Sequence, residues 1–381
     1  MKRLIYLLFA VLLFAGCGSK DNDQNNDPPD EMEEYPEGKD VYAAGFENNA
    51  QSNPVARFWK NGYVQNLTDN AGNIVYSSGT DWTVIRSVAS SVFASDDDVY
   101  VAGYEELSRV IQETEQSETY EVIARARLWK NGVMQNLTNG ILSDVARSVF
   151  VSGEEVYVLG YEALENPYML AIKVWKDGEA EIIAEVSGPS QLNNPLSQVV
   201  NSFFVSDGIV YIAGRGTNQA KLWKNEEEEN LDSGTEAQSV FVSGDDVYVA
   251  GCGNSVAKLW KNGTVENLTN GSKNACAFSV YISDNDIYVC GNDGFGAGDA
   301  RLWKNGIVQD LPDAKDAVLF QSVFVKGDDV YLAGYVWAVQ EVESGAVPLT
   351  YLKATLWENG KKLNLDVGKN INSQACSVFV K

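Results

Sequence analysis

The feature that most constrains this chain is a sequence unit that recurs seven times. A clear copy contains four short runs, at residues 239–242, 247–251, 257–260 and 265–269. These runs are rich in β-branched and aromatic residues and are separated by turn residues, which predicts four β-strands, named A to D in that order. The copies are marked by seven tryptophans in strand C: Trp59, Trp129, Trp175, Trp223, Trp260, Trp303 and Trp357.

The spacing of the runs predicts how the strands are connected. Nine residues separate the strand-A serine from the strand-B tyrosine in six copies, and eight separate the tryptophan from the apolar residue of strand D in all seven. The B–C connection varies instead, with between 8 and 25 residues from the strand-B glycine to the tryptophan. In a four-stranded meander the A–B and C–D turns share one end, so each copy has a fixed end and a variable end. Radial repetition of such sheets is typical of a β-propeller.

The two ends of the repeat region predict how the ring closes. The region begins in strand B, at 41–45, without a preceding strand A, and it finishes in strand A, at 377–380. We therefore expect an all-β, seven-bladed propeller of four-stranded antiparallel blades, whose first blade is completed by the C-terminal strand. Asn-Gly or Asp-Gly between strands C and D predicts a tight type I′ turn in six blades, whereas Asn225-Glu226 predicts a distorted one.

Composition excludes several functions. The formal net charge is −24, which disfavours nucleic acid as a partner. The chain contains no histidine, which removes Ser-His-Asp and Cys-His catalysis and the commonest zinc ligand. The sequence accordingly gives no reason to assign a catalytic residue, a metal or a cofactor.

The N-terminal segment has the pattern of an exported lipoprotein. Lys2 and Arg3 precede an apolar run at 4–16, which is too short to span a bilayer but suits a signal peptide. The run ends in Leu-Phe-Ala-Gly before Cys17 and resembles a lipobox, which implies lipidation of Cys17; the alternative is an ordinary signal peptide with a chance cysteine. Residues 18–38 are acidic and polar and are expected to form a flexible tether, and residues 39–381 to form the propeller.

Two resemblances extend this interpretation. Residues 19–23, Ser-Lys-Asp-Asn-Asp, are similar to the acidic export signal of Bacteroidota surface lipoproteins. Residues 40–381 resemble the seven-bladed propeller lipoproteins of the same group, which carry Trp-Lys-Asn-Gly repeats. We expect a monomer that is attached to the membrane by its lipid anchor alone. The resemblance implies the propeller fold and a location at the outer membrane, on the cell surface. It implies no activity, and the repeats lack the Trp-Asp dipeptide of WD40 proteins and the Asp-box of sialidases.

Candidate binding residues lie at the variable end, because all blades share the same structural demands and differ mainly there. One set directly follows the strand-B glycine: Phe46, Tyr104, Tyr161, Arg215, Cys252, Asn292 and Tyr335. A second set directly precedes the strand-A serine and should lie near the channel mouth: Ser90, Arg147, Asn201, Gln238, Phe278, Gln321 and Cys376. From these sets we select as ligand-binding candidates Tyr104, Tyr161, Arg215, Asn292, Tyr335, Arg147, Gln238 and Gln321. The mixture suits a sugar or a peptide, and the alternative for each residue is loop packing.

Two tryptophans outside the repeat, Trp82 and Trp337, are further candidates, since each either contacts a ligand or fills its own long loop. The inserts at 104–126 and 335–354 are expected to extend strands B and C into longer hairpins. Four cysteines follow Cys17: Cys252, Cys276, Cys290 and Cys376. Cys290 is expected in the core, and the sequence leaves the disulfide pairing open.

Three functions are compatible with this sequence. The first is a surface-displayed binding module for a glycan or a protein, using the variable end. The second is a carboxylate-dependent glycosidase or lyase, for which Glu105, Glu106, Glu162 and Asp293 are available without forming an evident pair. The third is a structural subunit of an outer-membrane complex.

Overall fold

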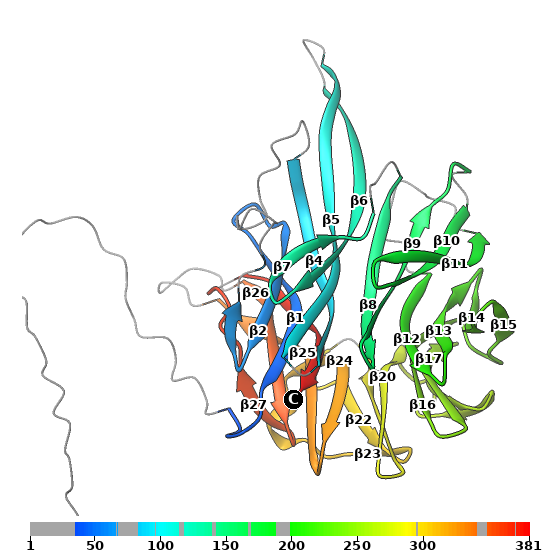
Figure 1. Ribbon diagram of the computed structural model, residues 1–381. Helices are drawn as coiled ribbons and strands as arrows, with labels where there is room; N and C mark the ends of the chain where they lie inside the picture. The colour runs from blue at the N-terminus through cyan, green and yellow to red at the C-terminus, as the bar shows by residue number, and fades with distance from the viewer. Residues whose placement is uncertain are drawn as a thin grey trace, which may run out of the picture. The chain divides into compact units, whose positions relative to one another are not determined.

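The computed structural model describes residues 35–65, 67, 83–95, 97–113, 118–138, 142–166, 169–187, 199–294, 296–340, 349–369 and 371–381. The chain divides into two units, Met1–Met32 and Glu33–Lys381, and the described residues all belong to the second. Among them, no helix has the length and the hydrophobicity needed to cross a membrane. This second unit is built almost entirely from β-strands, as Figure 1 shows.

The strands form seven four-stranded antiparallel sheets, one for each repeat of the sequence. The blades, written from the innermost strand outward, begin with blade 1: β28 (Ser373–Val380), β1 (Val41–Asn48), β2 (Pro54–Lys60) and β3 (Tyr63–Gln65). Blade 2 consists of β4 (Thr83–Ser95), β5 (Asp98–Glu113), β6 (Glu118–Lys130) and β7 (Val133–Asn136). Blade 3 consists of β8 (Asp144–Ser152), β9 (Glu155–Ala163), β10 (Met169–Lys176) and β11 (Glu179–Ser187).

The remaining blades repeat this order. Blade 4 consists of β12 (Val200–Ser206), β13 (Ile209–Gly216), β14 (Gln219–Lys224) and β15 (Glu227–Asn230). Blade 5 consists of β16 (Glu236–Ser243), β17 (Asp246–Gly253), β18 (Val256–Lys261) and β19 (Thr264–Asn267). Blade 6 consists of β20 (Ala275–Ser283), β21 (Asp286–Asp293), β22 (Ala300–Lys304) and β23 (Ile307–Val308). Blade 7 consists of β24 (Ala317–Lys326), β25 (Asp329–Val339), β26 (Thr350–Glu358) and β27 (Lys361–Asn364), and the 3-10 helix η1 (Pro312–Ala314) precedes it.

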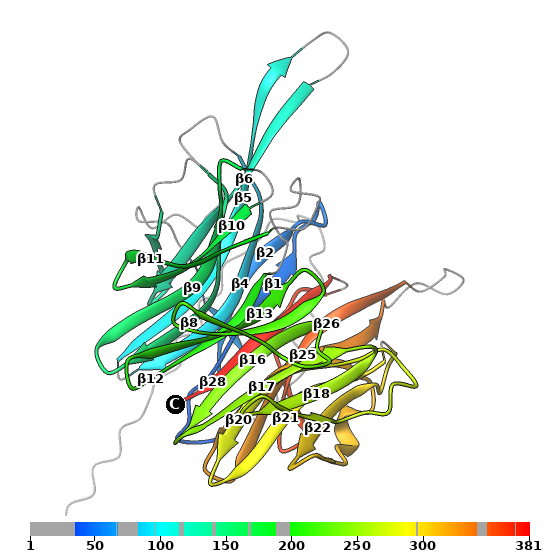
Figure 2. The ribbon, with the colours of Figure 1, turned by 90° about the vertical axis from the view of Figure 1, so that its right-hand side faces the viewer.

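The C-terminal strand closes the ring. β28 pairs antiparallel with β1, and Val41 lies opposite Val380 in the register. The seven innermost strands contact one another in a closed cycle, since β28 lies between β24 and β4. The predicted seven-bladed propeller, with its first blade completed by the last strand of the chain, is therefore confirmed (Figure 2).

The core lies between neighbouring blades, and the repeated tryptophans are its largest members. All seven are 0–1% exposed. Trp260 of blade 5 packs with Leu222 and Leu231 of blade 4 and with Val240 of its own blade. Its indole N–H donates to the carbonyl oxygen of Asp232, 3.0 Å away in the connection from blade 4. A buried tryptophan removes about 150–250 Å² from water, so each of these residues stabilises an interface between blades and not only its own sheet.

At the fixed end, one polar cluster recurs from blade to blade. In blade 5, the Asn262 side-chain oxygen accepts from the Val247 N–H at 2.8 Å, while its amide group donates to Asp246. Lys261 pairs with the same aspartate at 2.7 Å, and this hydrogen bond is the main reason that the Asp246 pKa is lowered. In blade 7, Glu358 takes the place of this lysine, and Lys39 from before the first blade pairs with Asp329 instead. The acidic residues of these turns are therefore paired with lysine, from their own repeat in blade 5 and from the segment before blade 1 in blade 7.

The turns between strands C and D follow the sequence, with one departure. Six have positive φ at both central residues, as in Asn262 (φ 49°) and Gly263 (φ 77°), which is the type I′ pattern. In blade 4 only Asn225 has a positive φ, at 51°, because Glu226 carries a Cβ where the other blades have glycine. The predicted distortion of this turn is confirmed.

Candidate functional site

Each innermost strand contains one extra residue at the same place. In blade 5, Ala237 pairs with Gly251 and Ser239 pairs with Ala250, so Gln238 has no partner in the neighbouring strand. Such a β-bulge turns a side chain away from the regular alternation of the strand. The seven extra residues, called the mouth ring below, are Ser90, Arg147, Asn201, Gln238, Phe278, Gln321 and Cys376. They are the residues that the sequence predicted near the channel mouth.

The bulge explains the repeated glycine of strand B. A Cβ on Gly251 would overlap the carbonyl oxygen of Glu236, and every equivalent glycine meets the same backbone atom of its own innermost strand. Only glycine permits this close backbone approach. The strand-B glycine and the bulge therefore occur together in every blade. They keep the backbone of the seven mouth-ring residues in the same conformation while the side chains of those residues differ.

Directly below the mouth ring, the strand-A serines join the blades. The Ser91 hydroxyl oxygen accepts a hydrogen bond from the Val149 N–H of the next blade, at 3.3 Å. Ser377 accepts in the same way from Val92 at 3.2 Å, across the point of ring closure. The innermost strands are therefore connected by side chain to backbone hydrogen bonds as well as by packing.

Below the serines, seven aromatic side chains form a closed ring around the channel. Adjacent ring centroids lie 4.5 to 5.2 Å apart, and the cycle closes through the contacts of Phe379 with Phe93 and Phe324. This aromatic ring consists of Phe93, Phe150, Phe204, Phe241, Tyr281, Phe324 and Phe379. Because it lies two residues beyond the serine, it forms a floor roughly 10 Å from the mouth ring.

Two of the predicted tyrosines are buried. Tyr104 and Tyr161 are each 3% exposed, and burial raises the pKa of both phenols. These two ligand-binding candidates pack in the core beside Val88 and Val145, which is the loop-packing alternative given for each residue of the set. Tyr335 is half-buried, and burial also raises its pKa.

Three other candidates are held by protein partners. Arg215 pairs with Glu236 at 2.7 Å, and the amide group of Gln238 donates to the other oxygen of the same carboxylate at 3.0 Å. Asn292 is fully buried; its side-chain oxygen accepts from the Cys276 N–H at 3.0 Å, and its amide group donates to the Gly294 carbonyl. Asn292 therefore shapes its own loop, whereas Arg215 and Gln238 form a small polar network at the rim.

Two hairpins extend beyond the ring at the variable end, as predicted from the inserts. The β5–β6 hairpin carries exposed Val110, Ile111, Tyr120 and Val122, and it projects well past the neighbouring strands (Figure 1). Trp337 lies on the β25–β26 hairpin opposite Leu352 and is 42% exposed. Trp337 is therefore partly accessible to solvent, and its contact with a ligand stays a prediction. Trp82 lies outside the described residues.

The acidic candidates are mostly paired with cations. Glu105 pairs with Arg127 at 2.8 Å in a buried cross-strand contact, and Glu162 pairs with Lys173 at the equivalent position of blade 3. Asp293 lies 3.9 Å from Arg301. Burial raises the pKa of Glu106, and Arg86, 3.8 Å away, opposes that rise. Within the described ranges, no three acidic, cysteine or histidine side chains gather as metal ligands would.

The cysteines occupy three environments. Cys252 and Cys276 form a disulfide that joins blades 5 and 6 at the variable end. Cys290 is fully buried, as predicted, and burial raises its pKa. Cys376 is a free thiol in the mouth ring, and burial raises its pKa to about 11 while Arg147 partly offsets that rise.

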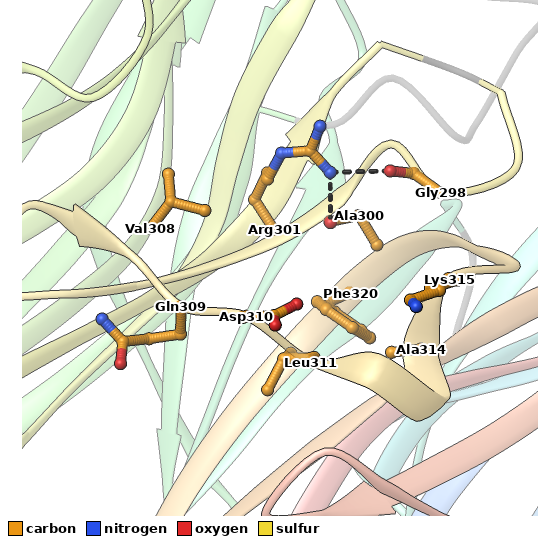
Figure 3. A pocket seen from close by; sticks show the side chains of 10 residues that line it. All are labelled: Gly298, Ala300, Arg301, Val308, Gln309, Asp310, Leu311, Ala314, Lys315 and Phe320. Atoms are coloured by element: carbon orange, nitrogen blue, oxygen red, sulfur yellow. Dashed lines mark hydrogen bonds between the residues drawn. The ribbon is translucent and has the colours of Figure 1, made fainter.

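A cavity that the sequence analysis missed lies between blades 6 and 7. It measures about 420 Å³ and is bounded by the 298–301 segment, the 308–315 connection and Phe320 (Figure 3). Arg301 points along its wall and donates to the carbonyl oxygens of Gly298 and Ala300 at 2.7 and 2.9 Å. The sequence did contain one signal for this cavity, the unusual glycine-rich B–C connection of blade 6. The cavity is formed by that connection together with the connection from blade 6 to blade 7, so neither segment alone predicts it.

The chain was compared with known proteins. No protein-family model and no curated protein matches it. Among solved structures, the designed protein Ika8 aligns with a TM-score of 0.39 and 14% identity, over 78% of this chain and 96% of that one. Acylaminoacyl peptidase from Pyrococcus horikoshii aligns at 0.40 and 14%, over 73% of this chain and 52% of its own. Trypanosoma rangeli sialidase aligns at 0.37 and 9%, over 71% and 52%. The class of this protein, a seven-bladed β-propeller, is established by its own sheet topology.

Proposed function

We propose that this protein is a surface-displayed lipoprotein that binds an extracellular ligand, a glycan or a protein, at the variable end of its propeller. The observation that carries the proposal is the mouth ring. Seven bulges fix the backbone of seven equivalent residues, yet their side chains are serine, arginine, asparagine, glutamine, phenylalanine, glutamine and cysteine. A constant frame that presents different groups is the arrangement expected of a recognition surface.

Two features support an extracellular location. Disulfides persist in oxidising compartments outside the cytoplasm, and Cys252 and Cys276 form one. The lipobox-like run before Cys17 and the polar residues 18–38 supply an anchor and a tether of the expected kind. A Cys17→Ser variant should lose labelling by an alkyne fatty acid in growing cells; labelling that persists would remove the anchor from this proposal.

The enzyme alternative has less support. A glycosidase needs two carboxyl groups facing a shared substrate, one of them free to accept or donate a proton. Glu105, Glu162 and Asp293 instead form ion pairs with an arginine or a lysine on the adjacent strand of their own blade. A binding module therefore fits the described residues better.

A glycan microarray with residues 33–381 tests the proposal, because this unit contains the complete closed ring. Loss of binding in Trp337→Ala or Trp82→Ala would assign the site to the variable end. Tyr63→Ala is the matched control, since Tyr63 is 60% exposed but adjoins a turn at the fixed end. If no glycan is bound, crosslinking on intact cells should capture a protein partner. Failure of both experiments, or equal loss in the Tyr63 variant, would overturn the proposal.

A further inference from the structure

The mouth ring contains polar atoms that the protein itself leaves without partners. In the described part of the chain, Ser90 Oγ, Arg147 Nε, Asn201 Oδ1 and Gln321 Oε1 are buried and have no hydrogen-bond partner. Buried polar atoms in proteins are nearly always bonded, and leaving one unbonded is costly. Four such atoms in a single ring of seven residues mark a site built to receive polar groups from outside the fold.

Arg147 is the only charged member of this ring. Other arginines at the variable end have acidic partners, such as Arg215 with Glu236 and Arg127 with Glu105. Arg147 forms no ion pair with any described residue. A guanidinium is always charged, and its partial burial is unfavourable unless an anion accompanies it. The net charge of the chain is −24, so carboxylates are abundant, yet none of the described ones pairs with this arginine. Arg147 is therefore available to an anion from outside the chain.

Arg147 is the extra residue of the blade 3 bulge, in the same ring as Cys376 of blade 1. Burial raises the pKa of Cys376 and of Tyr104 in blade 2, and the charge of Arg147 opposes both rises. The nearby carboxylate of Glu106 has its own cation, because Arg86 Nη1 lies 3.8 Å from its Oε1. The remaining ring members are neutral, and Asn201 keeps its place by donating to the Ala237 carbonyl of the next blade at 2.8 Å.

We propose that the mouth ring binds a carbohydrate that carries a carboxylate, with the carboxylate on Arg147 and the sugar hydroxyls on Ser90, Asn201 and Gln321. This inference rests on the binding function proposed above and names its ligand class. The planar guanidinium matches a carboxylate in a two-point contact. One cation among neutral hydroxyl and amide groups matches a ligand with one negative charge and many hydroxyls better than it matches a peptide.

The test uses residues 33–381 on an array of uronate-containing oligosaccharides, each printed beside its carboxyl-reduced form, together with sulfated and neutral glycans. We expect binding to a carboxylated glycan, and at least tenfold weaker binding to the reduced form. Arg147→Gln should abolish the difference between the two forms, while Arg147→Lys should keep part of it. Arg109→Gln is the matched control, because it removes the same charge from the exposed β5–β6 hairpin and should leave binding unchanged.

Each other outcome overturns the inference in a distinguishable way. Equal binding of native and reduced glycans, or preference for sulfated ones, would keep the proposed binding function and reject the carboxylate. If no glycan on the array is bound and crosslinking captures a protein partner, a carbohydrate ligand is rejected. Binding that survives Arg147→Gln would place the carboxylate elsewhere on the surface.

Discussion

The hydroxyl oxygen of Ser239 in blade 5 accepts a hydrogen bond from the backbone N–H of Val280 in blade 6, at 3.2 Å. Val280 lies on the innermost strand, where this N–H faces the neighbouring blade and not a partner strand of its own sheet. The same contact recurs between the serine of one blade and the valine of the next. The repeated strand-A serine is thus a connector between blades, which explains why it recurs with such regular spacing.

Ser239→Ala should lower the free energy of unfolding by about 1 kcal/mol, because the Val280 N–H is left unpaired in a buried position. The measurement is the urea midpoint of residues 33–381. Ser243→Ala, at the exposed end of the same strand, is the control and should change the midpoint little. Equal effects from the two variants would contradict a linking role for the inner serine.

Gly251→Ala should be more damaging, by about 3 kcal/mol, because the new Cβ overlaps the Glu236 carbonyl and the bulge cannot relax without losing its pairing. Gly244→Ala is the comparison. Its position is open and only its positive φ of 58° opposes a side chain, which costs about 1 kcal/mol. If both substitutions shift the melting temperature equally, the link between glycine and bulge is incorrect.

Deleting residues 376–381 should open the ring. The deletion removes most of β28, the partner of β1, and takes Phe379 from between Phe93 and Phe324. We expect a broad, less cooperative thermal transition and rapid proteolysis of the exposed β1 edge. Lys381→Ala is the control for a change at the chain end, and an unchanged melting curve for the deletion would reject the closure.

Reducing the Cys252–Cys276 disulfide should lower stability by about 2–4 kcal/mol, since the bond closes a loop with a sequence separation of 24 residues. Thermal melting with and without dithiothreitol measures the effect. A Cys376→Ser protein should respond to reductant like the wild type, because Cys376 is outside the bond. A Cys252→Ser protein should be insensitive to it.

Cys376 should react slowly with iodoacetamide at pH 8. Burial disfavours the charged thiolate and raises its pKa to about 11, against about 8.5 for a free cysteine, so its reactive fraction rises only as the pH approaches 11. Arg147→Gln should slow the reaction further, because the arginine charge lowers this pKa. Mass spectrometry of a pH series measures the rates. Ordinary reactivity at pH 8 would show that the pKa of this half-buried thiol is not raised.

Spacing alone predicted the blades, the order of their strands and the closing strand, because each of these follows from local pattern and from where the pattern begins and stops. The sequence predicted the seven positions of the mouth ring but not the β-bulge that orients their side chains. In the sequence, the bulged residue is marked only by its place directly before the strand-A serine. The burial of Tyr104 and Tyr161 was also missed. Val88 and Val145 lie directly opposite these tyrosines in their own blades, but the burial depends on a cluster that joins blades 2, 3 and 4, which no spacing within a blade supplies. The pairing of Cys252 with Cys276 required the distance between two blades, which no spacing supplies.

The aromatic ring has a consequence for the shape of any ligand. Centroids spaced 4.5 to 5.2 Å apart around seven positions put opposite rings roughly 11 Å apart, which leaves space for water but not for a sugar once atomic radii are subtracted. A polymer therefore cannot be threaded through this protein from one face to the other. A polymeric ligand that binds at the mouth ring, as proposed, would present a terminus or a branch to it, or lie across it, and would leave by the same side.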